Sequence, residues 1–167
     1  DLYLLAVSDE SIIPVSSSLP EEAFVIHTAG CVSLDAITQK RAGVFYPLQS
    51  FSEGRDIDFS NIPIGIESKI NTDLNLLKNL AENIKASAFE MDSKQREQLH
   101  LAAVFVNNFT NHLFLEAEEI CKKNALSFDI LKPIIKETFE KIETLSPQNT
   151  QTGPALRRDE KTIKKHL

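Results

Sequence analysis

The sequence has 167 residues, which is enough for one medium-sized domain or two small ones. Its net charge of −6 argues against nucleic acid as a partner, because no basic face is available to neutralise phosphates. The two cysteines, Cys31 and Cys121, provide neither a disulfide framework nor metal-ligand spacing. We therefore expect a cytoplasmic protein without a metal site.

The first part of the chain reads as strands that alternate with helices. Residues 2–7 (LYLLAV) form a continuous apolar run, which suits a strand buried on both faces. A helix-start signal follows at residues 8–11 (SDES). Residues 23–27 (AFVIH) are a second short buried strand, and residues 33–40 read as a short helix. A third strand is expected at residues 43–46 (GVFY), stopped by a proline.

The pattern continues to about residue 92. Residues 62–67 (IPIGIE) predict a weaker fourth strand at a sheet edge, since Pro63 and Gly65 suit an edge position. An amphipathic helix is expected from residue 72 to about residue 84, with leucines on one stripe. Residues 86–91 complete the series as a short strand.

Only helices are expected after residue 92. Ser93 is a plausible N-cap for a long helix that runs to about residue 123. Residues 128–145 predict a further helix or pair of helices, interrupted at Pro133. A polar loop at residues 146–154 then precedes a terminal helix at residues 155–167.

This order of elements predicts an α/β domain joined to an all-α domain. We expect residues 1–92 to be the C-terminal half of a doubly wound nucleotide-binding domain, and residues 93–167 to be an all-helical domain, to which the resemblance described below assigns dimerisation and substrate binding. The strands are too few for a covered parallel sheet, and no G-x-G-x-x-G turn occurs. The chain is therefore expected to be part of a longer protein.

The most unusual segment is residues 98–115, which contain no Lys, Arg, Asp or Glu. At helical spacing its polar residues share one stripe or lie at its edge, opposite an apolar face. Amides and imidazoles on an uncharged helix predict a semi-buried polar surface, in which each group needs a hydrogen-bond partner. That partner is either a ligand or another helix, and the sequence leaves both open. The stripe consists of His100, Asn107, Asn108, Asn111 and His112.

A second candidate region lies where the expected strands end. In open parallel sheets ligands gather at the carboxyl ends of strands, and these ends are small or polar here. Each loop alone also fits an ordinary turn that caps a helix, but three loops at one edge favour a cleft. The segments are Ser8-Asp9, Thr28-Ala29-Gly30 and Tyr46-Pro47-Leu48-Gln49.

Other polar residues are weaker candidates. His27 ends a strand and is either a general acid or base or a hydrogen-bonded core histidine. His100 and His112 lack a third ligand candidate, which argues against a metal. The uncharged segment is long enough to cross a membrane, but its three Asn and two His residues would be costly in lipid.

Five blocks of the sequence resemble a bacterial family of Rossmann-like NADP-binding proteins that carry a C-terminal helical domain of unknown function. In chain order they are DLYLLAVSDESI, VIHTAG, GVFYPLQSF, QLHLAAVFVNNFTNHLF and QTGPALRRDEKTIKKHL. The family is similar, distantly, to pyrroline-carboxylate reductase and the hydroxyacid dehydrogenases. The resemblance implies an absent N-terminal portion with the Gly-rich phosphate loop. It also implies a helical domain of the 6-phosphogluconate-dehydrogenase C-terminal type, which commonly forms homodimers.

The resemblance also implies roles for particular residues. The segment Val7-Ser8-Asp9 would lie by the nicotinamide of NADP or NAD, and Thr28-Ala29-Gly30 would form the loop between cofactor and substrate. Asn108, Asn111 and His112 would face that cleft, with His112 as acid or base and Asn108 and Asn111 orienting the substrate. Gln49 and His100 are expected to bind substrate. Hydroxyacid dehydrogenases place a catalytic lysine on the corresponding helix, whereas this sequence has Asn and His.

Two functional classes follow from these observations. The first is an NAD(P)-dependent oxidoreductase that acts on a small molecule, in which the protein orients the reacting groups and supplies a proton. The second is a non-enzymatic module that binds a dinucleotide or a partner protein. Nucleic acid and membrane are not expected as partners of either.

Overall fold

The computed structural model describes residues 1–166, without the side chain of His166. Its contacts divide the chain into two compact units, Asp1–Asn111 and His112–Leu167. The first unit contains the sheet and the first turns of a long helix, and the second contains only helices among its described residues. We describe each unit by itself.

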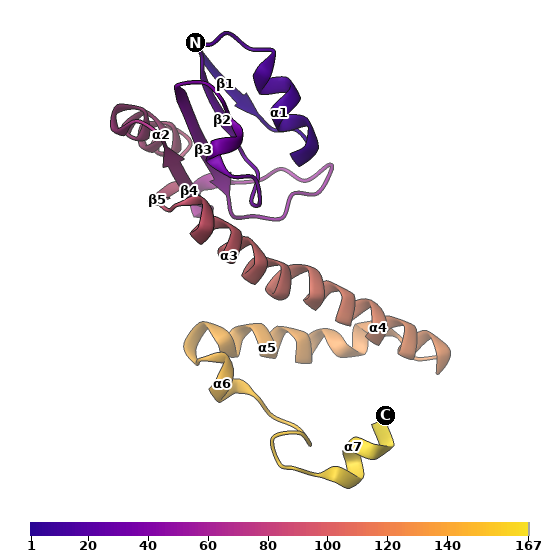
Figure 1. Ribbon diagram of the computed structural model, residues 1–167. Coiled ribbons are helices and arrows are strands. Elements are labelled where there is room, and N and C mark those ends of the chain that lie inside the picture. The colour runs from indigo at the N-terminus through magenta and orange to yellow at the C-terminus, as the bar shows by residue number, and fades with distance from the viewer. Residues whose placement is uncertain (167) are drawn as a thin grey trace. The chain divides into compact units, whose positions relative to one another are not determined.

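The first unit is built on a five-stranded sheet in the order β1-β2-β3-β4-β5 (Figure 1). β1 pairs with β2, and β2 with β3, in parallel, whereas β3 and β4 are antiparallel and β4 and β5 are parallel again. The predicted α/β fold class is confirmed, with one antiparallel pair in an otherwise parallel sheet. The strands are β1 (Leu2–Leu5), β2 (Phe24–His27), β3 (Arg41–Pro47), β4 (Pro63–Ser68) and β5 (Ser87–Glu90).

Helices on both faces of the sheet create two separate cores. α1 (Asp9–Ser17) contributes Ile12 to a core that includes Val25 and Val44. α2 (Asn71–Asn83) contributes Leu77 to the core on the other face. Successive strand residues point to opposite faces, so β2 and β3 supply side chains to both cores. This double coverage explains why β2 is buried along its whole length.

Two expectations about the strands were wrong. The first strand is buried on one face only, because Leu5 joins the core that contains Ile12 of α1, whereas Leu2 and Leu4 point to the other face and are 48% and 45% exposed. The fourth strand is not at an edge, since β4 lies between β3 and β5. Gly65 fits this inner position for a steric reason. A Cβ there would meet the Met91 side chain at 2.7 Å.

The N-cap of the long helix lies one residue earlier than expected. Asp92, not Ser93, is the N-cap of α3 (Ser93–Ala103), and its carboxylate accepts from the Gln95 backbone N–H while the Gln95 side chain accepts from the Asp92 N–H. A π-helical segment, Val104–Phe109, interrupts the α-helical hydrogen bonding before α4 (Thr110–Lys123). Such segments are rare and occur often at functional sites.

The helices after the long one are shorter than expected. A 3₁₀ turn at Phe128–Leu131 leads into α5 (Lys132–Thr144), and Pro133 lies in the first turn of α5 rather than interrupting a helix. α6 (Pro147–Thr150) occupies part of the expected polar loop, and α7 (Glu160–His166) is the shorter counterpart of the expected terminal helix. Earlier in the chain, residues 33–40 also form less helix than expected, namely one 3₁₀ turn, Leu34–Ala36.

Among the described residues, no helix is long and apolar enough to cross a membrane.

Candidate functional site

The carboxyl ends of β1, β2 and β3 lie at one edge of the sheet, because these strands are parallel. An open hollow of about 660 Å³ lies there. Its walls come from all three strand ends, from α2 and from α3, and they are mostly apolar. The predicted loop residues in its lining are Val7, Asp9, Thr28, Ala29, Gly30, Tyr46, Pro47 and Gln49, and His100 lines it as well.

A second open hollow, of about 360 Å³, lies between the end of β3 and the helix that follows the sheet. Its polar lining comes from Gln49 and Ser50 on one side and from Asn107 and Asn108 on the π-helical segment. Tyr46, Gln49 and His100 line both hollows. The two spaces therefore adjoin at these three side chains.

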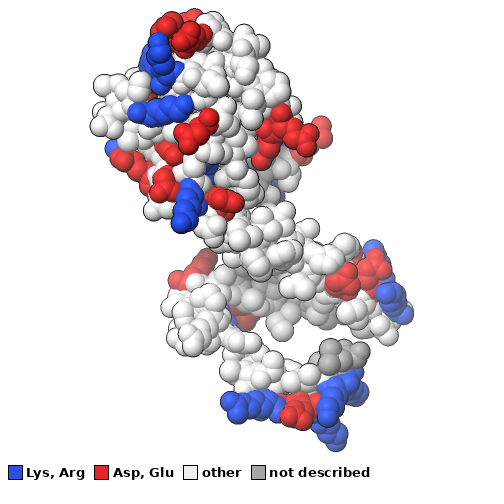
Figure 2. All heavy atoms as spheres, in the orientation of Figure 1, with Lys and Arg blue, Asp and Glu red and all other residues white. Residues whose placement is uncertain are grey.

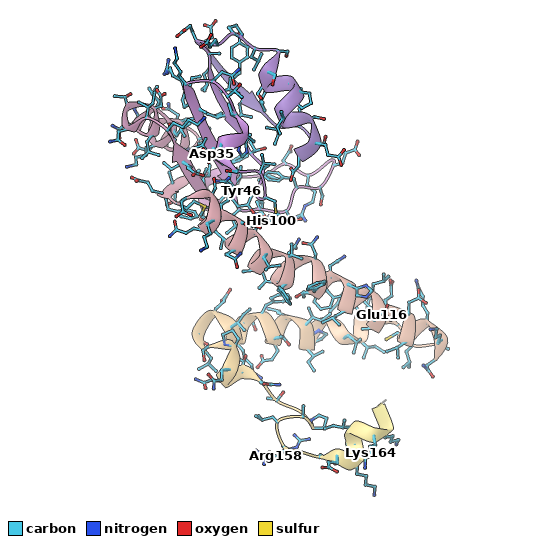
Figure 3. The ribbon with its side chains drawn as sticks, viewed as in Figure 1. Asp35, Tyr46, His100, Glu116, Arg158 and Lys164 are labelled. Atoms are coloured by element: carbon cyan, nitrogen blue, oxygen red, sulfur yellow. The ribbon has the colours of Figure 1, made fainter. Side chains whose placement is uncertain are left out.

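Tyr46 and His100 form a hydrogen-bonded pair at this junction. The phenol oxygen lies 2.9 Å from His100 Nδ1, and the two rings meet edge to face with centroids 6.0 Å apart. Tyr46 comes from the end of β3 and His100 from α3, and Figure 3 shows the two side chains adjacent. Burial raises the pKa of Tyr46, the Cys31 thiol raises it further and Arg96 opposes the shift. Tyr46 therefore keeps its proton at neutral pH.

The loop after β2 packs closely on His100. A Cβ added at Gly30 would lie 2.4 Å from His100 Nδ1 and 2.6 Å from His100 Cγ, closer than non-bonded atoms approach. Only a glycine lets this loop approach the imidazole without moving it. Gly30 thus helps to fix the ring that Tyr46 contacts.

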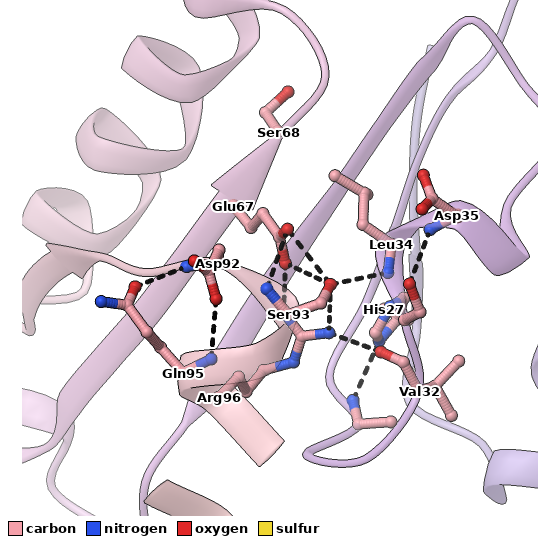
Figure 4. Close-up of polar contacts among 12 residues, drawn as sticks. His27, Val32, Leu34, Asp35, Glu67, Ser68, Asp92, Ser93, Gln95 and Arg96 are labelled. Carbon is pink, nitrogen blue, oxygen red and sulfur yellow. Dashed lines mark hydrogen bonds and ion pairs between the residues drawn. The ribbon is translucent and has the colours of Figure 1, made fainter. Parts of the chain in front are cut away.

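A buried ionic network anchors the start of α3 (Figure 4). Arg96 is fully buried, and its guanidinium donates to the Glu67 carboxylate at the end of β4 and to the Val32 carbonyl. Ser93 donates to Glu67 as well, with its backbone N–H and with its hydroxyl, and its hydroxyl oxygen accepts from the Leu34 N–H. The network joins α3 to β4 and to the loop after β2. It thereby fixes His100, one turn further along α3.

His27 is a buried, neutral histidine beside this network. Burial and the charge of Arg96 lower its pKa to about 4. Its Nδ1 accepts from the Ala29 N–H at 3.2 Å, while Nε2 has no partner among the described residues. Of the two roles that the sequence left open, these contacts favour the core histidine. Burial also raises the pKa of the Cys31 thiol, helped by the Asp9 and Glu97 carboxylates, so Cys31 is not an activated nucleophile.

Residues 62–167 match the model of a family described as a domain of unknown function, DUF2520. The chain belongs to this family. The match covers the end of the sheet unit and all of the helices that follow it, which confirms the resemblance to a family with a helical domain of unknown function. No curated protein matched the chain.

Two solved structures resemble this DUF2520 protein along almost its whole length. A putative NADP oxidoreductase from Bacteroides fragilis is 41% identical, with a TM-score of 0.88, and the match covers 99% of this chain and 66% of that one. A protein from Thermotoga maritima is 24% identical, with a TM-score of 0.78 and coverage of 99% and 67%, and it shows the fold alone. The chain thus spans about two thirds of the length of these relatives.

The polar stripe of this chain is more exposed to solvent than the sequence predicted. Asn107, Asn108, Asn111 and His112 are all exposed rather than semi-buried, and only His100 is half-buried. Six of the large apolar side chains in the same segment are exposed too, namely Leu101, Phe105, Val106, Phe109, Leu113 and Leu115. Phe105 and Phe109 contact each other edge to face, with ring centroids 4.9 Å apart. In the space-filling view this segment is white, since it carries no charged residue (Figure 2).

The candidate site residues fall into three groups. Those of the strand-end loops line the first hollow, except Ser8, whose hydroxyl pairs with that of Ser11 at 2.8 Å. His100 and Asn108 line the second hollow with Gln49, whereas Asn111 lines neither hollow. His112 belongs to the helical unit, where Nε2 lies 3.8 Å from Glu116 Oε1.

Sequence reasoning overlooked two parts of this site. It treated Tyr46 only as a strand end, and it assigned no role to Glu67 or Arg96. The alternation of β3 was the available signal for Tyr46, because it places Tyr46 on the same face as the buried Val44. No signal linked Glu67 to Arg96, since they are 29 residues apart and on different elements.

Proposed function

We propose that this chain is part of an NAD(P)-dependent oxidoreductase that acts on a small molecule. The observation that carries the proposal is the hollow of about 660 Å³ at the carboxyl ends of three parallel strands, where open α/β sheets bind their ligands. The similarity to a Bacteroides fragilis protein described as a putative NADP oxidoreductase supports the same function. The cofactor is proposed to be NADP, with NAD as the alternative.

The lining of this hollow fits one end of such a cofactor. Ala6, Val7 and Leu4 provide apolar surface for an aromatic ring, and the Thr28 hydroxyl and the backbone of Ala29 and Gly30 offer polar contacts for an uncharged amide. No Lys or Arg is among the residues that line it, so these residues suit a nicotinamide rather than a pyrophosphate. The bound dinucleotide would supply the hydride, and the chain would orient the substrate and provide the proton.

The pyrophosphate is proposed to bind to a preceding portion of the full-length protein that contains a Gly-rich turn. This sequence has no such turn, and the Bacteroides fragilis relative is longer than the region matched here. Isothermal titration of NADPH into the full-length protein and into the 167-residue chain would test this division. We expect micromolar or tighter binding only by the full-length protein. Equal, tight binding by the 167-residue chain would refute the proposed division of the site.

The same titration separates the enzyme from a non-enzymatic protein-interaction module. Exposed apolar side chains on the helices favour a protein contact in either case, and we propose a homodimer through them. The largest exposed fractions are those of Val106 at 72%, Ile130 at 68%, Leu113 at 65%, Ile134 at 64% and Ile120 at 61%. If the full-length protein dimerises but binds neither NADPH nor NADH, the interaction module is the correct function.

A further inference from the structure

We propose that Tyr46 is the group that gives a proton to the substrate, that His100 restores that proton, and that the substrate is an uncharged carbonyl compound. The inference rests on the proposed oxidoreductase function and adds to it a proton donor and a substrate class. Tyr46 and His100 stand at the junction of the two hollows, where a substrate in one would meet a cofactor in the other.

The position of the Tyr46 hydroxyl carries the first step. Reduction of a carbonyl group adds a hydride at carbon and a proton at oxygen. The Tyr46 O–H bond breaks as the new O–H bond forms on the substrate, and the proton on His100 Nδ1 crosses the 2.9 Å contact to the phenolate oxygen. The imidazole takes up a solvent proton at Nε2, which is the one proton that the reduction consumes, so His100 ends as its other neutral tautomer and neither side chain carries a charge. Exchange with solvent then resets the pair.

The surroundings of the pair make it suitable for this step. Tyr46 is 7% exposed, so bulk water does not compete strongly for its hydroxyl. Gly30 confines the imidazole on one side, and the buried Arg96 network fixes the helix that carries it. The raised pKa of Tyr46 keeps the proton on the phenol until the substrate oxygen gains negative charge.

The charges around the two hollows limit the substrate. Neither hollow has a Lys or Arg among its lining residues, and the one charged residue in the two sets is Asp9, which lines the first hollow. A phosphate or carboxylate would therefore meet no cationic side chain among these lining residues, and in the first hollow it would be repelled by Asp9. The amide side chains of Gln49, Asn107 and Asn108 instead match neutral donors and acceptors.

The kinetic test uses the full-length protein with NADPH and two matched probes, a 2-oxo amide and the corresponding 2-oxo acid. We expect the amide to have at least a tenfold higher kcat/KM. Tyr46→Phe should lower kcat by about 100-fold or more, as expected when a general acid is lost, and should leave the Kd of NADPH within about twofold. Tyr3→Phe removes the hydroxyl of the other tyrosine, in β1, and is the matched control with unchanged kcat.

A second measurement does not depend on turnover. Nitrogen NMR of the histidine rings in the 167-residue chain should show His100 protonated at Nδ1, and Tyr46→Phe should change its tautomer whereas Tyr3→Phe should not. In the kinetic assay, His100→Gln should slow proton delivery and increase the solvent deuterium isotope effect on kcat. A merely structural role would leave that isotope effect unchanged.

The outcomes separate this inference from the function on which it rests. Failure of the wild-type protein to bind any nicotinamide dinucleotide would remove the proposed function itself. Normal NADPH binding with an active Tyr46→Phe variant, or with a 100-fold loss in His112→Ala instead, would overturn the proton donor. Preference for the acid, or no reduction of either probe, would overturn the substrate class. A His100 ring protonated only at Nε2 would overturn the direction of proton transfer.

Discussion

Replacing Arg96 by methionine tests whether the buried network holds α3 to the sheet. Methionine has a similar length and no charge, so Arg96→Met removes the guanidinium without leaving a large cavity. The Glu67 carboxylate, whose side chain is only 17% exposed, then loses its counter-charge. The Val32 carbonyl loses its hydrogen-bond donor at the same time.

The expected cost follows from these contacts. Removing one partner of a buried ion pair typically costs about 3–5 kcal/mol, because the other charge stays buried and uncompensated. Glu67 retains the Ser93 N–H at 3.0 Å and the Ser93 hydroxyl at 2.8 Å, so the lower end of this range applies. We expect Arg96→Met to lower the free energy of unfolding by about 3 kcal/mol, or the melting temperature by roughly 10 °C.

Urea denaturation followed by tyrosine fluorescence measures this change in the sheet unit alone. The chain has no tryptophan, and both tyrosines, Tyr3 and Tyr46, lie in strands of that unit. Arg55→Met, at an exposed loop position, is the matched control and should change stability by less than about 0.5 kcal/mol.

A double variant then isolates the charge pair. Adding Glu67→Gln to Arg96→Met removes the uncompensated charge and should recover about 1 kcal/mol or more. A loss below about 1 kcal/mol in the single variant would refute the reasoning. A double variant whose loss of stability equals the sum of the losses in the two single variants would refute it as well.

Four further predictions follow from the same contacts. Folding lowers the pKa of His27 from 6.5 to about 4, so the stability that neutral His27 contributes is complete above pH 6.5 and is lost as the pH falls towards 4. In urea titrations between pH 7 and pH 5, the wild type should therefore lose about 2 kcal/mol more stability than His27→Gln. Parallel pH profiles of the two proteins would contradict this. Gly30→Ala must displace the His100 ring, so in the full-length protein it should lower kcat by about tenfold or more while the far-ultraviolet circular dichroism stays unchanged. Full activity of this variant would show that the position of the ring does not matter. If His112 is the acid or base, as the sequence suggested, His112→Ala should lower turnover about 100-fold with little change in melting temperature, whereas the Tyr46 assignment requires nearly unchanged turnover. Sedimentation at high micromolar concentration should show a dimer, and a monomer alone would count against the proposed contact of the exposed apolar residues.

The sequence predicted the positions of strands and helices along the chain better than it predicted which of them lie next to one another. Hydrophobic runs and turn residues placed β2, β3, α2 and β5 within a few residues of their observed bounds. Pairing is different, because it depends on contacts between residues distant in the chain. The run at residues 2–7 is apolar enough for a covered strand, but no described neighbour lies beyond β1 to cover it.

The polar residues show a second limit of predictions that rest on local sequence patterns. Periodicity predicts that His100, Asn107 and Asn111 share a stripe, but the π-helical segment Val104–Phe109 changes the helical spacing along this stretch. Periodicity also cannot show what faces these residues. In this chain the stripe is open, and only His100, at its start, meets another functional side chain. Tyr46 was overlooked for the same reason, since its importance comes from a partner 54 residues away.

Both limits bear on where the chemistry of this protein lies. A buried charge such as Arg96 is costly unless the fold needs its contacts, and here those contacts fix the start of the helix that carries His100. Close approach of Gly30 to the same imidazole adds a second constraint from a different element. His112 has no comparable support in its own unit, because it is 63% exposed and its described ionic contact is to an equally exposed carboxylate one turn away. A reactive side chain is not enough for catalysis unless its position is also fixed. The constrained Tyr46–His100 pair is therefore a better candidate for proton transfer than His112.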